Sequence, residues 1–554
     1  MNFGFVIDNR KCIGCHACTV ACKAEHDVPL GVNRTWVKYI EKGEFPNTRR
    51  LFSVMRCNHC EDAPCVDICP VAALYTRPDG IVDFDNQRCI GCKSCMQACP
   101  YDALYIDPES HTAAKCNYCA HRIDIGLEPA CVNVCPEHAI ISGDLDDPTS
   151  EIAQLIAREQ VQARKVEKGT KPKLFYIDGD AASLVPGMAP PSTNYIQTEQ
   201  TSGVGHFVKF AEQRLQEADP QKMAQQLAGN GSQVSAGSPE DYGVKVPEMA
   251  TGGSSALNKA WAVVREQARR VYDAPSKGIL WGWEVSSYVW TKAIAAGTFM
   301  LIAFDNRFNF ASFSDQAQWA SWAISLIFLA LTGLLLIKDL DQPKRFLYVL
   351  LRPQWNSWLV RGGYFITLFG GVVTLWGLAH WQTIGWLQVA TEWLGLALGV
   401  MVAVYTAFLF AQAKGRDFWQ TPTLPLHMLV NALLAGEAVL AILNLLGPVE
   451  DGFLFMSMPI AMIFTLLANL AILAAEIFIT HPTSDARLAV EMIIKGRFAG
   501  LFYVGVLLVG NLIPLAMLLL GLTGLMPVIG ALILIGLYCT EHIWVRAPQY
   551  VPLA

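Results

Sequence analysis

The stretch CIGCHACTVAC at residues 12–22 returns almost unchanged as CIGCKSCMQACP at residues 89–100. Both follow the spacing Cys-x2-Cys-x2-Cys-x3-Cys. Two further blocks are CNHCEDAPCVDICP at 57–70 and CNYCAHRIDIGLEPACVNVCP at 116–136. Such near-repeats within one chain indicate an internally duplicated domain.

This spacing is typical of iron–sulfur clusters. Three thiolates in Cys-x2-Cys-x2-Cys surround one cluster, while the fourth cysteine, at the start of a helix, ligates the other cluster of a pair. Structural zinc is the alternative, but zinc ribbons usually pair two Cys-x2-Cys hooks. Sixteen thiolates supply four [4Fe–4S] clusters. The predicted ligands are Cys12, Cys15, Cys18, Cys22, Cys57, Cys60, Cys65, Cys69, Cys89, Cys92, Cys95, Cys99, Cys116, Cys119, Cys131 and Cys135.

The composition divides the chain of 554 residues into two parts. Hydrophobic residues make up 53% and charged residues only 16%, against about 25% charged in average proteins. Only Cys539 lies outside the cysteine-rich region. The net charge of −6 gives no basic excess that would favour nucleic acid. No apolar stretch precedes Cys12, so we expect no signal peptide and reduced thiols that act as ligands. Export of the folded domain together with a partner that carries a signal is the alternative.

Three regions are predicted. Residues 1–186 form a four-cluster ferredoxin-type domain, 187–278 a flexible linker with a surface helix, and 279–554 a membrane domain. Within the first, Ser150 is expected to cap a helix and LFYI at 174–177 to form a strand. Within the second, the basic segment 257–272 is expected to lie as a helix along the membrane surface.

The membrane domain is predicted from eight apolar segments near the required length of about 20 residues. We therefore expect an α+β, duplicated ferredoxin-like [4Fe–4S] domain followed by an all-α domain of eight transmembrane helices. The last two segments form one run, so a hairpin is expected near 521–524. The segments are 285–304, 319–337, 358–379, 394–413, 424–446, 453–479, 498–520 and 522–539.

Charges in the loops predict the orientation. Eleven lysines and arginines lie on the side that carries both termini, against Arg307 alone on the opposite side. The positive-inside rule then places both termini and the cysteine domain in the cytoplasm of a bacterium or archaeon, with a multi-pass domain in its inner membrane.

The four cysteine blocks, in this order and with the x11 gap of the last one, resemble the four-cluster electron-transfer subunits of molybdopterin oxidoreductases. The resemblance covers about residues 1–180 and implies crosswise ligand sets. We number these sets from the catalytic subunit towards the membrane. The first is Cys12, Cys15, Cys18 and Cys135; the second Cys22, Cys116, Cys119 and Cys131; the third Cys57, Cys60, Cys65 and Cys99; the fourth Cys69, Cys89, Cys92 and Cys95.

The segments DLDQPKRF at 339–346, WNSWLVRGGYF at 355–365 and VYTAFLFAQAKGRDFW at 404–419 resemble the NrfD-type anchor of polysulfide reductase and its relatives. This resemblance covers about residues 280–545. It implies a quinone site (menaquinone or ubiquinone) near the iron–sulfur side and no haem in this chain. The sequence also disfavours haem, because bis-histidine ligation needs paired histidines within the spans, where only His427 lies.

Polar residues inside the spans indicate function. Tyr405, His427 and Lys292 are predicted to line the quinone pocket, with Asp339 and Glu437 as proton relays. The structural alternative is that Lys292–Glu437 or Asp339–Arg361 are buried ion pairs. Glu476, near a span end, is expected to reach water.

The combined prediction is an electron-transfer and membrane-anchor subunit of a quinone-linked molybdopterin (Mo or W) complex. The chain is then a redox subunit, with the substrate-converting enzyme as a separate partner. Two other functions remain open: a component of a redox-driven proton-translocating complex, and a hydrogenase-linked module.

Overall fold

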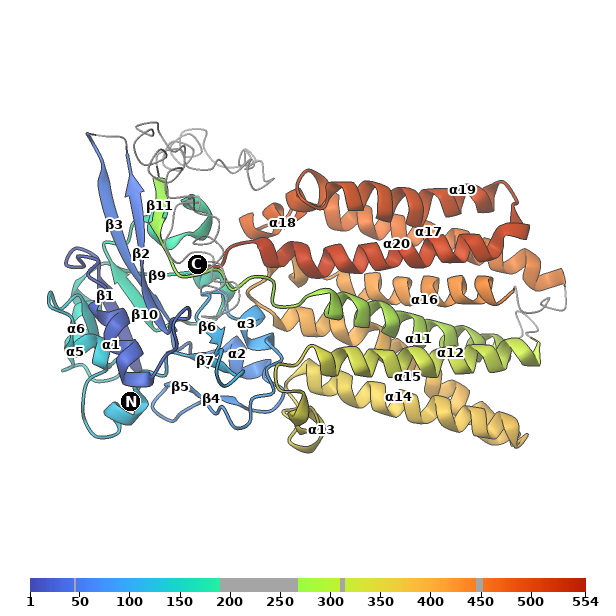
Figure 1. Cartoon of the computed structure of the whole chain (residues 1–554), viewed down its shortest axis with the longest axis horizontal. Helices are drawn as coiled ribbons and strands as arrows, with labels where there is room; N and C mark the ends of the chain where they lie inside the picture. Colours follow the sequence, from blue (N-terminus) through green and yellow to red (C-terminus); the bar gives the residue numbers. More distant parts are fainter. Residues whose placement is uncertain (44–45, 190–267, 309–313, 445–451) are drawn as a thin grey trace, which may run out of the picture. The chain divides into compact units, whose positions relative to one another are not determined.

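The structure is a computed structural model that describes residues 1–43, 46–189, 268–308, 314–444 and 452–554 (Figure 1). The chain divides into two compact units. The first unit comprises Met1–Val66, Ala73–Leu280 and Pro552–Ala554, and the second comprises Asp67–Ala72 and Trp281–Val551.

Two sheets organise the first unit. In one, β1 (Phe3–Asp8) pairs antiparallel with β8 (Ile140–Asp144) and parallel with β10 (Leu174–Ile177), which also pairs with β9 (Val161–Ala163). The other sheet has the order β11-β2-β3, with β2 at Thr35–Lys42, β3 at Arg49–Arg56 and β11 at Ala268–Tyr272. The strand predicted at 174–177 is thereby confirmed.

Two short hairpins and several short helices occur within and between the cysteine blocks and after the last block. The hairpins are β4 (Leu74–Thr76) with β5 (Val82–Phe84) and β6 (Leu104–Ile106) with β7 (Ala113–Lys115). The helices are α1 (Ala17–His26), α2 (Pro64–Asp67), α3 (Ser94–Ala98), α4 (Ala120–Ile123), α5 (Ala130–Asn133), α6 (Glu151–Arg158) and α7 (Ala181–Leu184). The predicted cap of α6 is confirmed, because Ser150 Oγ accepts a hydrogen bond from the Ala153 amide.

The helix predicted over 257–272 is wrong where the structure describes this segment. Ala268–Tyr272 form strand β11, which pairs antiparallel with β2. The buried Ala268 and Arg270 flank the exposed Arg269, a pattern of period two that suits a strand. Residues 257–267 lie outside the described residues.

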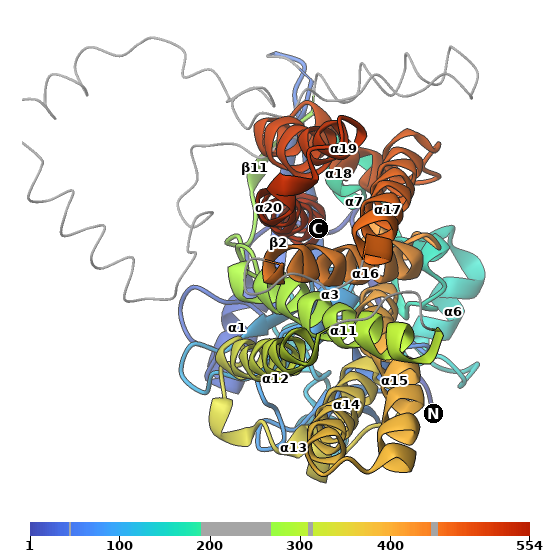
Figure 2. The ribbon, with the colours of Figure 1, turned by 90° about the vertical axis from the view of Figure 1, so that its right-hand side faces the viewer.

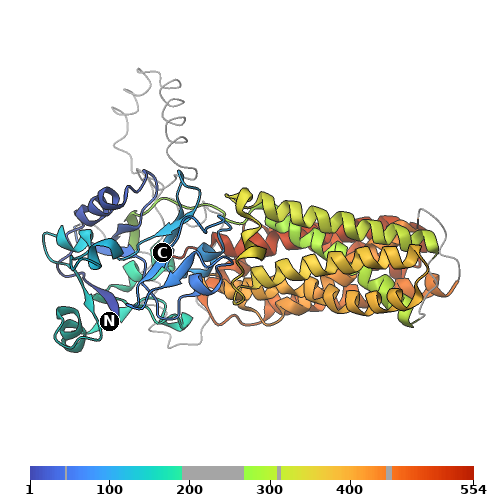
Figure 3. The same cartoon turned by 90° about the horizontal axis from the view of Figure 1, so that it is seen from below.

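Eight helices in the second unit are long and apolar enough to cross a membrane, which confirms the predicted number for the described residues. Four of them are α11 (Trp283–Phe308), α12 (Asp315–Lys338), α14 (Trp358–Trp381) and α15 (Gly385–Gln412). The other four are α16 (Leu424–Leu443), α17 (Gly452–Phe478), the π-helical η6 (Leu501–Leu512) continued by α19 (Ile513–Leu519), and α20 (Met526–Arg546). The helices run side by side along their length (Figure 3). The predicted hairpin is confirmed by a turn at Gly521, whose φ is 69°.

The second unit consists of two four-helix groups that meet at α11 and α16. Helix α11 packs on α12, α15 and α16, and α16 packs on α17 and α20 (Figure 2). At the meeting point, Gly297 of α11 lies against the backbone of Ala432 and Gly436 of α16, where an added Cβ would overlap with main-chain atoms. Small residues of this kind let membrane helices approach closely.

Candidate iron–sulfur and quinone sites

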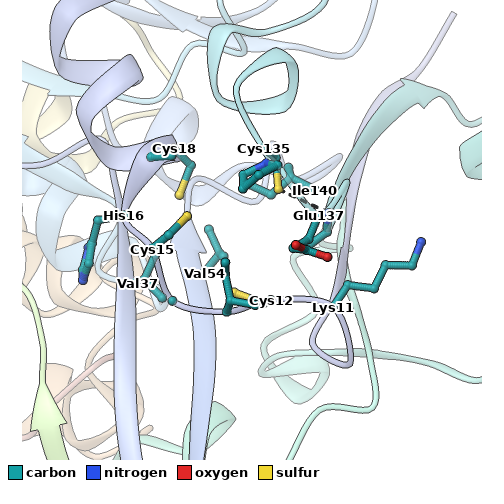
Figure 4. Close-up of a pocket in the computed structure, with 15 residues that line it drawn as sticks. Lys11, Cys12, Cys15, His16, Cys18, Val37, Val54, Cys135, Glu137 and Ile140 are labelled. Atoms are coloured by element: carbon teal, nitrogen blue, oxygen red, sulfur yellow. Dashed lines mark hydrogen bonds between the residues drawn. The ribbon is translucent and has the colours of Figure 1, made fainter.

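The first ligand set surrounds a pocket in the first unit. Cys12, Cys15, Cys18 and Cys135 line a partly open pocket, together with the apolar side chains of Val37, Val54 and Ile140 (Figure 4). Cys12 and Cys15 come from the loop before α1, Cys18 lies in the first turn of α1, and Cys135 comes from a distant block. The structure thus gathers the four thiols that the resemblance assigns to one cluster.

Local backbone geometry explains how the loop curves around this pocket. Gly14 has a φ of 71° and His16, just before α1, a φ of 62°. A side chain at Gly14 would collide with the ring of Phe52. In the third block Gly91 and Lys93 take the same conformation, with φ of 71° and 60°. Left-handed residues at matched positions therefore shape both copies of the repeat.

The second and third sets also gather as the resemblance implies. Cys22 lies within electrostatic range of Cys116, Cys119 and Cys131. In the third set, Cys65 lies within the same range of Cys57, Cys60 and Cys99.

The members of the fourth set divide between the two units, so its assembly stays a prediction. Cys89, Cys92 and Cys95 lie in the first unit, and the Cys89 sulfur accepts a hydrogen bond of 3.4 Å from the Ala113 amide. Cys69 lies in Asp67–Ala72, which belongs to the second unit. Within that unit Ser357 Oγ donates to the Ile68 carbonyl at 2.7 Å, and the Gln354 amide donates to the Pro70 carbonyl at 3.0 Å.

The surroundings of the thiols fit a metal cluster. Burial raises the pKa of Cys18 to about 11 and that of Cys60 to about 12, so these groups become thiolates only when a cation replaces the proton. Backbone amides of His59 and Ala139 point at the sulfurs of Cys57 and Cys135, at 3.4 and 3.3 Å. Amide donors to cluster sulfurs are among the groups that set cluster potentials.

In the second unit, Lys292 and Tyr405 meet in a buried polar site. Lys292, on α11, is 1% exposed and donates to the Ala403 carbonyl at 2.9 Å and to Thr406 Oγ1 at 2.7 Å. Its Nζ lies 4.7 Å from the centroid of the Tyr405 ring. Asp339 follows α12 and lies within electrostatic range of Tyr288, which in turn is within range of Tyr405.

His427 belongs to a second buried polar group. Its Nδ1 lies 2.8 Å from Glu476 Oε2, which also accepts a hydrogen bond of 2.8 Å from Trp544 Nε1. Thr423 Oγ1 donates to the other Glu476 oxygen at 2.9 Å. His427 is 1% exposed, and its Nε2 has no hydrogen-bond partner among the described residues. The expectation that Glu476 reaches water is wrong, because three side chains hold its carboxylate in the interior.

Glu541 connects these two groups and was missed by the sequence analysis. This carboxylate on α20 accepts a hydrogen bond of 2.9 Å from Asn431, which accepts one of 2.7 Å from Asn469. It lies within electrostatic range of both Lys292 and His427. The predicted last span ends at 539, whereas α20 continues to Arg546. A helical projection of α20 would have shown Glu541 and Trp544 on one face.

Glu437 of α16 contacts α17, and its role as a proton relay stays a prediction. It accepts a hydrogen bond of 2.5 Å from Thr465 on α17. The predicted ion pair Lys292–Glu437 does not form in the described part of the chain, since Lys292 bonds to α15 and Glu437 to α17. Arg361 Nε donates to the Trp355 carbonyl at 2.8 Å, and its pairing with Asp339 stays a prediction.

Comparison with known proteins supports both parts of the sequence. Residues 273–552 match the family described as polysulphide reductase, NrfD. Residues 11–74 and 48–145 match two models of 4Fe-4S dicluster domains.

Named relatives match the iron–sulfur part. A tetrathionate reductase subunit of Salmonella typhimurium is 44% identical over 196 residues, which cover 34% of this chain and 78% of the relative. A polysulfide reductase polypeptide of Wolinella succinogenes is 42% identical over 180 residues, 32% of this chain and 93% of the relative. The arsenate respiratory reductase iron-sulfur subunit ArrB of Shewanella sp. is 36% identical over 227 residues, 32% of this chain and 96% of the relative.

These matches confirm both resemblances and the fold class, and they establish a multi-pass membrane protein with iron–sulfur domains that transfer electrons. This protein belongs to the polysulphide reductase NrfD family, with a part homologous to reductase iron–sulfur subunits fused in front of its membrane helices.

Proposed function

We propose that this chain carries electrons through four [4Fe–4S] clusters between a separate molybdopterin (Mo or W) catalytic subunit and membrane quinone. The gathering of the cysteines into crosswise sets carries this proposal. Cys18 and Cys22 lie about one turn apart on α1 yet belong to the first and second sets. One helix therefore joins two neighbouring sites, as a chain of one-electron carriers requires.

The first ligand set supplies a place for the catalytic partner. Cys15 is exposed, and its pocket is partly open. Ile13, beside Cys12, is 55% exposed and Val134, beside Cys135, 40% exposed. Apolar side chains around an accessible redox site favour a protein partner that covers it.

The buried polar site of the second unit suits a quinone. Reduction of a quinone takes up two electrons and two protons, so its oxygens need hydrogen-bond donors connected to proton sources. The Lys292 ammonium and the Tyr405 hydroxyl are hydrogen-bond donors that lie close together. His427 Nε2 is a buried polar atom without a partner among the described residues. Glu476 contacts His427, and Glu541 lies within electrostatic range of His427 and Lys292. Asp339 lies within electrostatic range of Tyr288, which lies within range of Tyr405. In this proposal these three carboxylates hold and deliver the protons.

The quinone proposal is tested on the purified full chain in lipid nanodiscs. The clusters are reduced anaerobically with dithionite, the remaining dithionite is removed by gel filtration, a quinone analogue is added, and cluster absorbance is followed by stopped flow. We expect reoxidation that saturates with quinone concentration. A rate that stays linear in quinone up to its solubility limit would show an unspecific collision and refute a binding site.

Proton translocation is a second candidate, favoured by two further buried carboxylates in the second unit. Glu437 lies within α16. Glu392 lies near the start of α15 and is fully buried, and its carboxylate lies 2.6 Å from Arg307 near the end of α11. In proteoliposomes, Glu437→Gln is expected to abolish proton movement and to spare electron transfer. Survival of both activities in this variant would refute the candidate.

We further propose that the first unit lies on the cytoplasmic side, on the strength of the loop charges. Protease added to inverted membrane vesicles is expected to cleave the first unit, while right-side-out vesicles protect it. Cleavage in right-side-out vesicles alone would overturn this orientation.

A further inference from the structure

A buried arginine lies between the first and second ligand sets. Arg56, the last residue of β3, is 1% exposed, and one of its terminal nitrogens donates to the Cys131 sulfur at 3.2 Å. Its guanidinium carbon lies 4.5 Å from the centroid of the Phe5 ring. The other terminal nitrogen and Nε are buried without a partner in the described part of the chain. A guanidinium buried in this way requires acceptors.

The electrostatic neighbours of Arg56 belong to two ligand sets. Its charge acts on Cys131 and Cys116 of the second set and on Cys18 of the first. Cluster sulfur at either site would be an acceptor for the unpartnered nitrogens. The interior of a protein screens charges weakly, so one cation there influences both sites.

A buried lysine occupies the corresponding place between the second and third sets. Lys115, at the end of β7, is 0% exposed, and its Nζ donates to the Cys116 carbonyl at 2.8 Å and to the Val82 carbonyl. Its charge acts on Cys116 of the second set and on Cys65 of the third.

His26 serves as an internal comparison. Its Nε2 lies 3.1 Å from the Cys119 sulfur, a ligand of the second set alone. A histidine thus contacts a ligand of one set, whereas the two cations each act on ligands of two sets.

We propose that Arg56 and Lys115 are shared tuning cations, each of which raises the reduction potentials of the two clusters that it faces. Arg56 acts on the clusters of the first and second sets, and Lys115 on those of the second and third sets. Each cluster gains one electron on reduction, and a nearby positive charge stabilises the added negative charge. Shared cations keep neighbouring potentials close together, so that no cluster traps the electron. This inference rests on the proposed four-cluster function.

Potentiometric titration of the full chain, followed by electron paramagnetic resonance, tests the pairing. One cysteine-to-serine variant per set assigns each signal to its cluster. In Arg56→Gln the first two clusters should become harder to reduce by at least tenfold in the equilibrium constant, which is 59 mV for one electron. The third and fourth should not move. Lys115→Met should shift the second and third clusters only, and Arg56→Lys should restore most of the loss.

Arg164→Gln is the matched control, because Arg164 is buried but donates to the Leu184 and Leu553 carbonyls. It should leave all four potentials unchanged. A uniform shift of all clusters, or unchanged potentials in both test variants, would overturn the inference. Should Arg56→Gln fail to assemble, Lys115→Met decides by itself, since it addresses a different pair. Iron counted in wild type separates the two proposals: too few clusters refutes the four-cluster function, whereas four clusters with unmoved potentials refute only the shared cations.

Discussion

Replacing Lys292 by methionine should slow electron transfer to quinone without disturbing the clusters. The lysine Nζ already donates to the Ala403 carbonyl at 2.9 Å and to Thr406 Oγ1 at 2.7 Å, which leaves one N–H for a quinone oxygen. A hydrogen bond from a charged donor contributes about 1.5–3 kcal/mol. If this bond strengthens as the quinone oxygen gains negative charge, its loss slows the reaction by roughly 10- to 150-fold.

The assay is the reoxidation of dithionite-reduced clusters by a quinone analogue, measured at saturating and at low quinone. Lys338→Met is the matched control, since this lysine lies at the exposed end of α12, with its Nζ 4.1 Å from the centroid of the Trp283 ring. It should reoxidise at the wild-type rate. Iron content must equal that of wild type in both variants. A Lys292→Met chain with full iron and wild-type reoxidation would refute the assignment of Lys292 to the quinone pocket.

Three further variants test other parts of the account. Cys135→Ser should remove or alter only the cluster signal of the first set, because Cys135 is the one member of that set from a distant block; loss of a different signal would contradict the crosswise assignment. Gly362→Ala should displace the Tyr405 ring, which an added Cβ would overlap, and should raise the quinone concentration needed for half-maximal rate; an unchanged value would place Tyr405 outside the pocket. Ser150→Ala should lower stability to urea by about 1 kcal/mol through loss of the α6 cap, with cluster spectra unchanged; no change in the unfolding midpoint would contradict the role of the cap.

The iron–sulfur part could be predicted closely because its information is local. Three ligands of one site lie within seven residues, as in Cys12–Cys18, and the spacing alone indicates the chemistry. The tertiary structure, and not the local spacing, decides which distant cysteine completes each set. The assignment of Cys135 to the first pocket came from the resemblance, and the structure places it there.

The errors arose where packing decides the outcome. The segment 257–272 has helical periodicity, yet its last five residues, 268–272, pair with β2 and form a strand. Hydropathy ended the last span at 539 because Glu541 and His542 follow, although α20 continues to Arg546 and buries Glu541 against Asn431.

The contacts of the polar residues inside the membrane helices could not be predicted from the sequence either. Lys292 and Glu437 suggested an ion pair by charge alone. Their directions depend on helix rotation, which turns Lys292 towards α15 and Glu437 towards α17. The hydropathy profile carries no signal for such rotations, and helix–helix packing sets them.

The central claim is that this chain carries four clusters and serves a separate molybdenum or tungsten enzyme. It is tested most directly by isolating the full-length protein anaerobically from native membranes and measuring iron, molybdenum, tungsten, nickel and zinc in what co-purifies. We predict about 16 irons per chain, in addition to those of the partner, from four [4Fe–4S] clusters, together with one molybdenum or tungsten in a large additional polypeptide. Zinc in place of iron would contradict the clusters, and nickel in the partner would point instead to a hydrogenase-linked module.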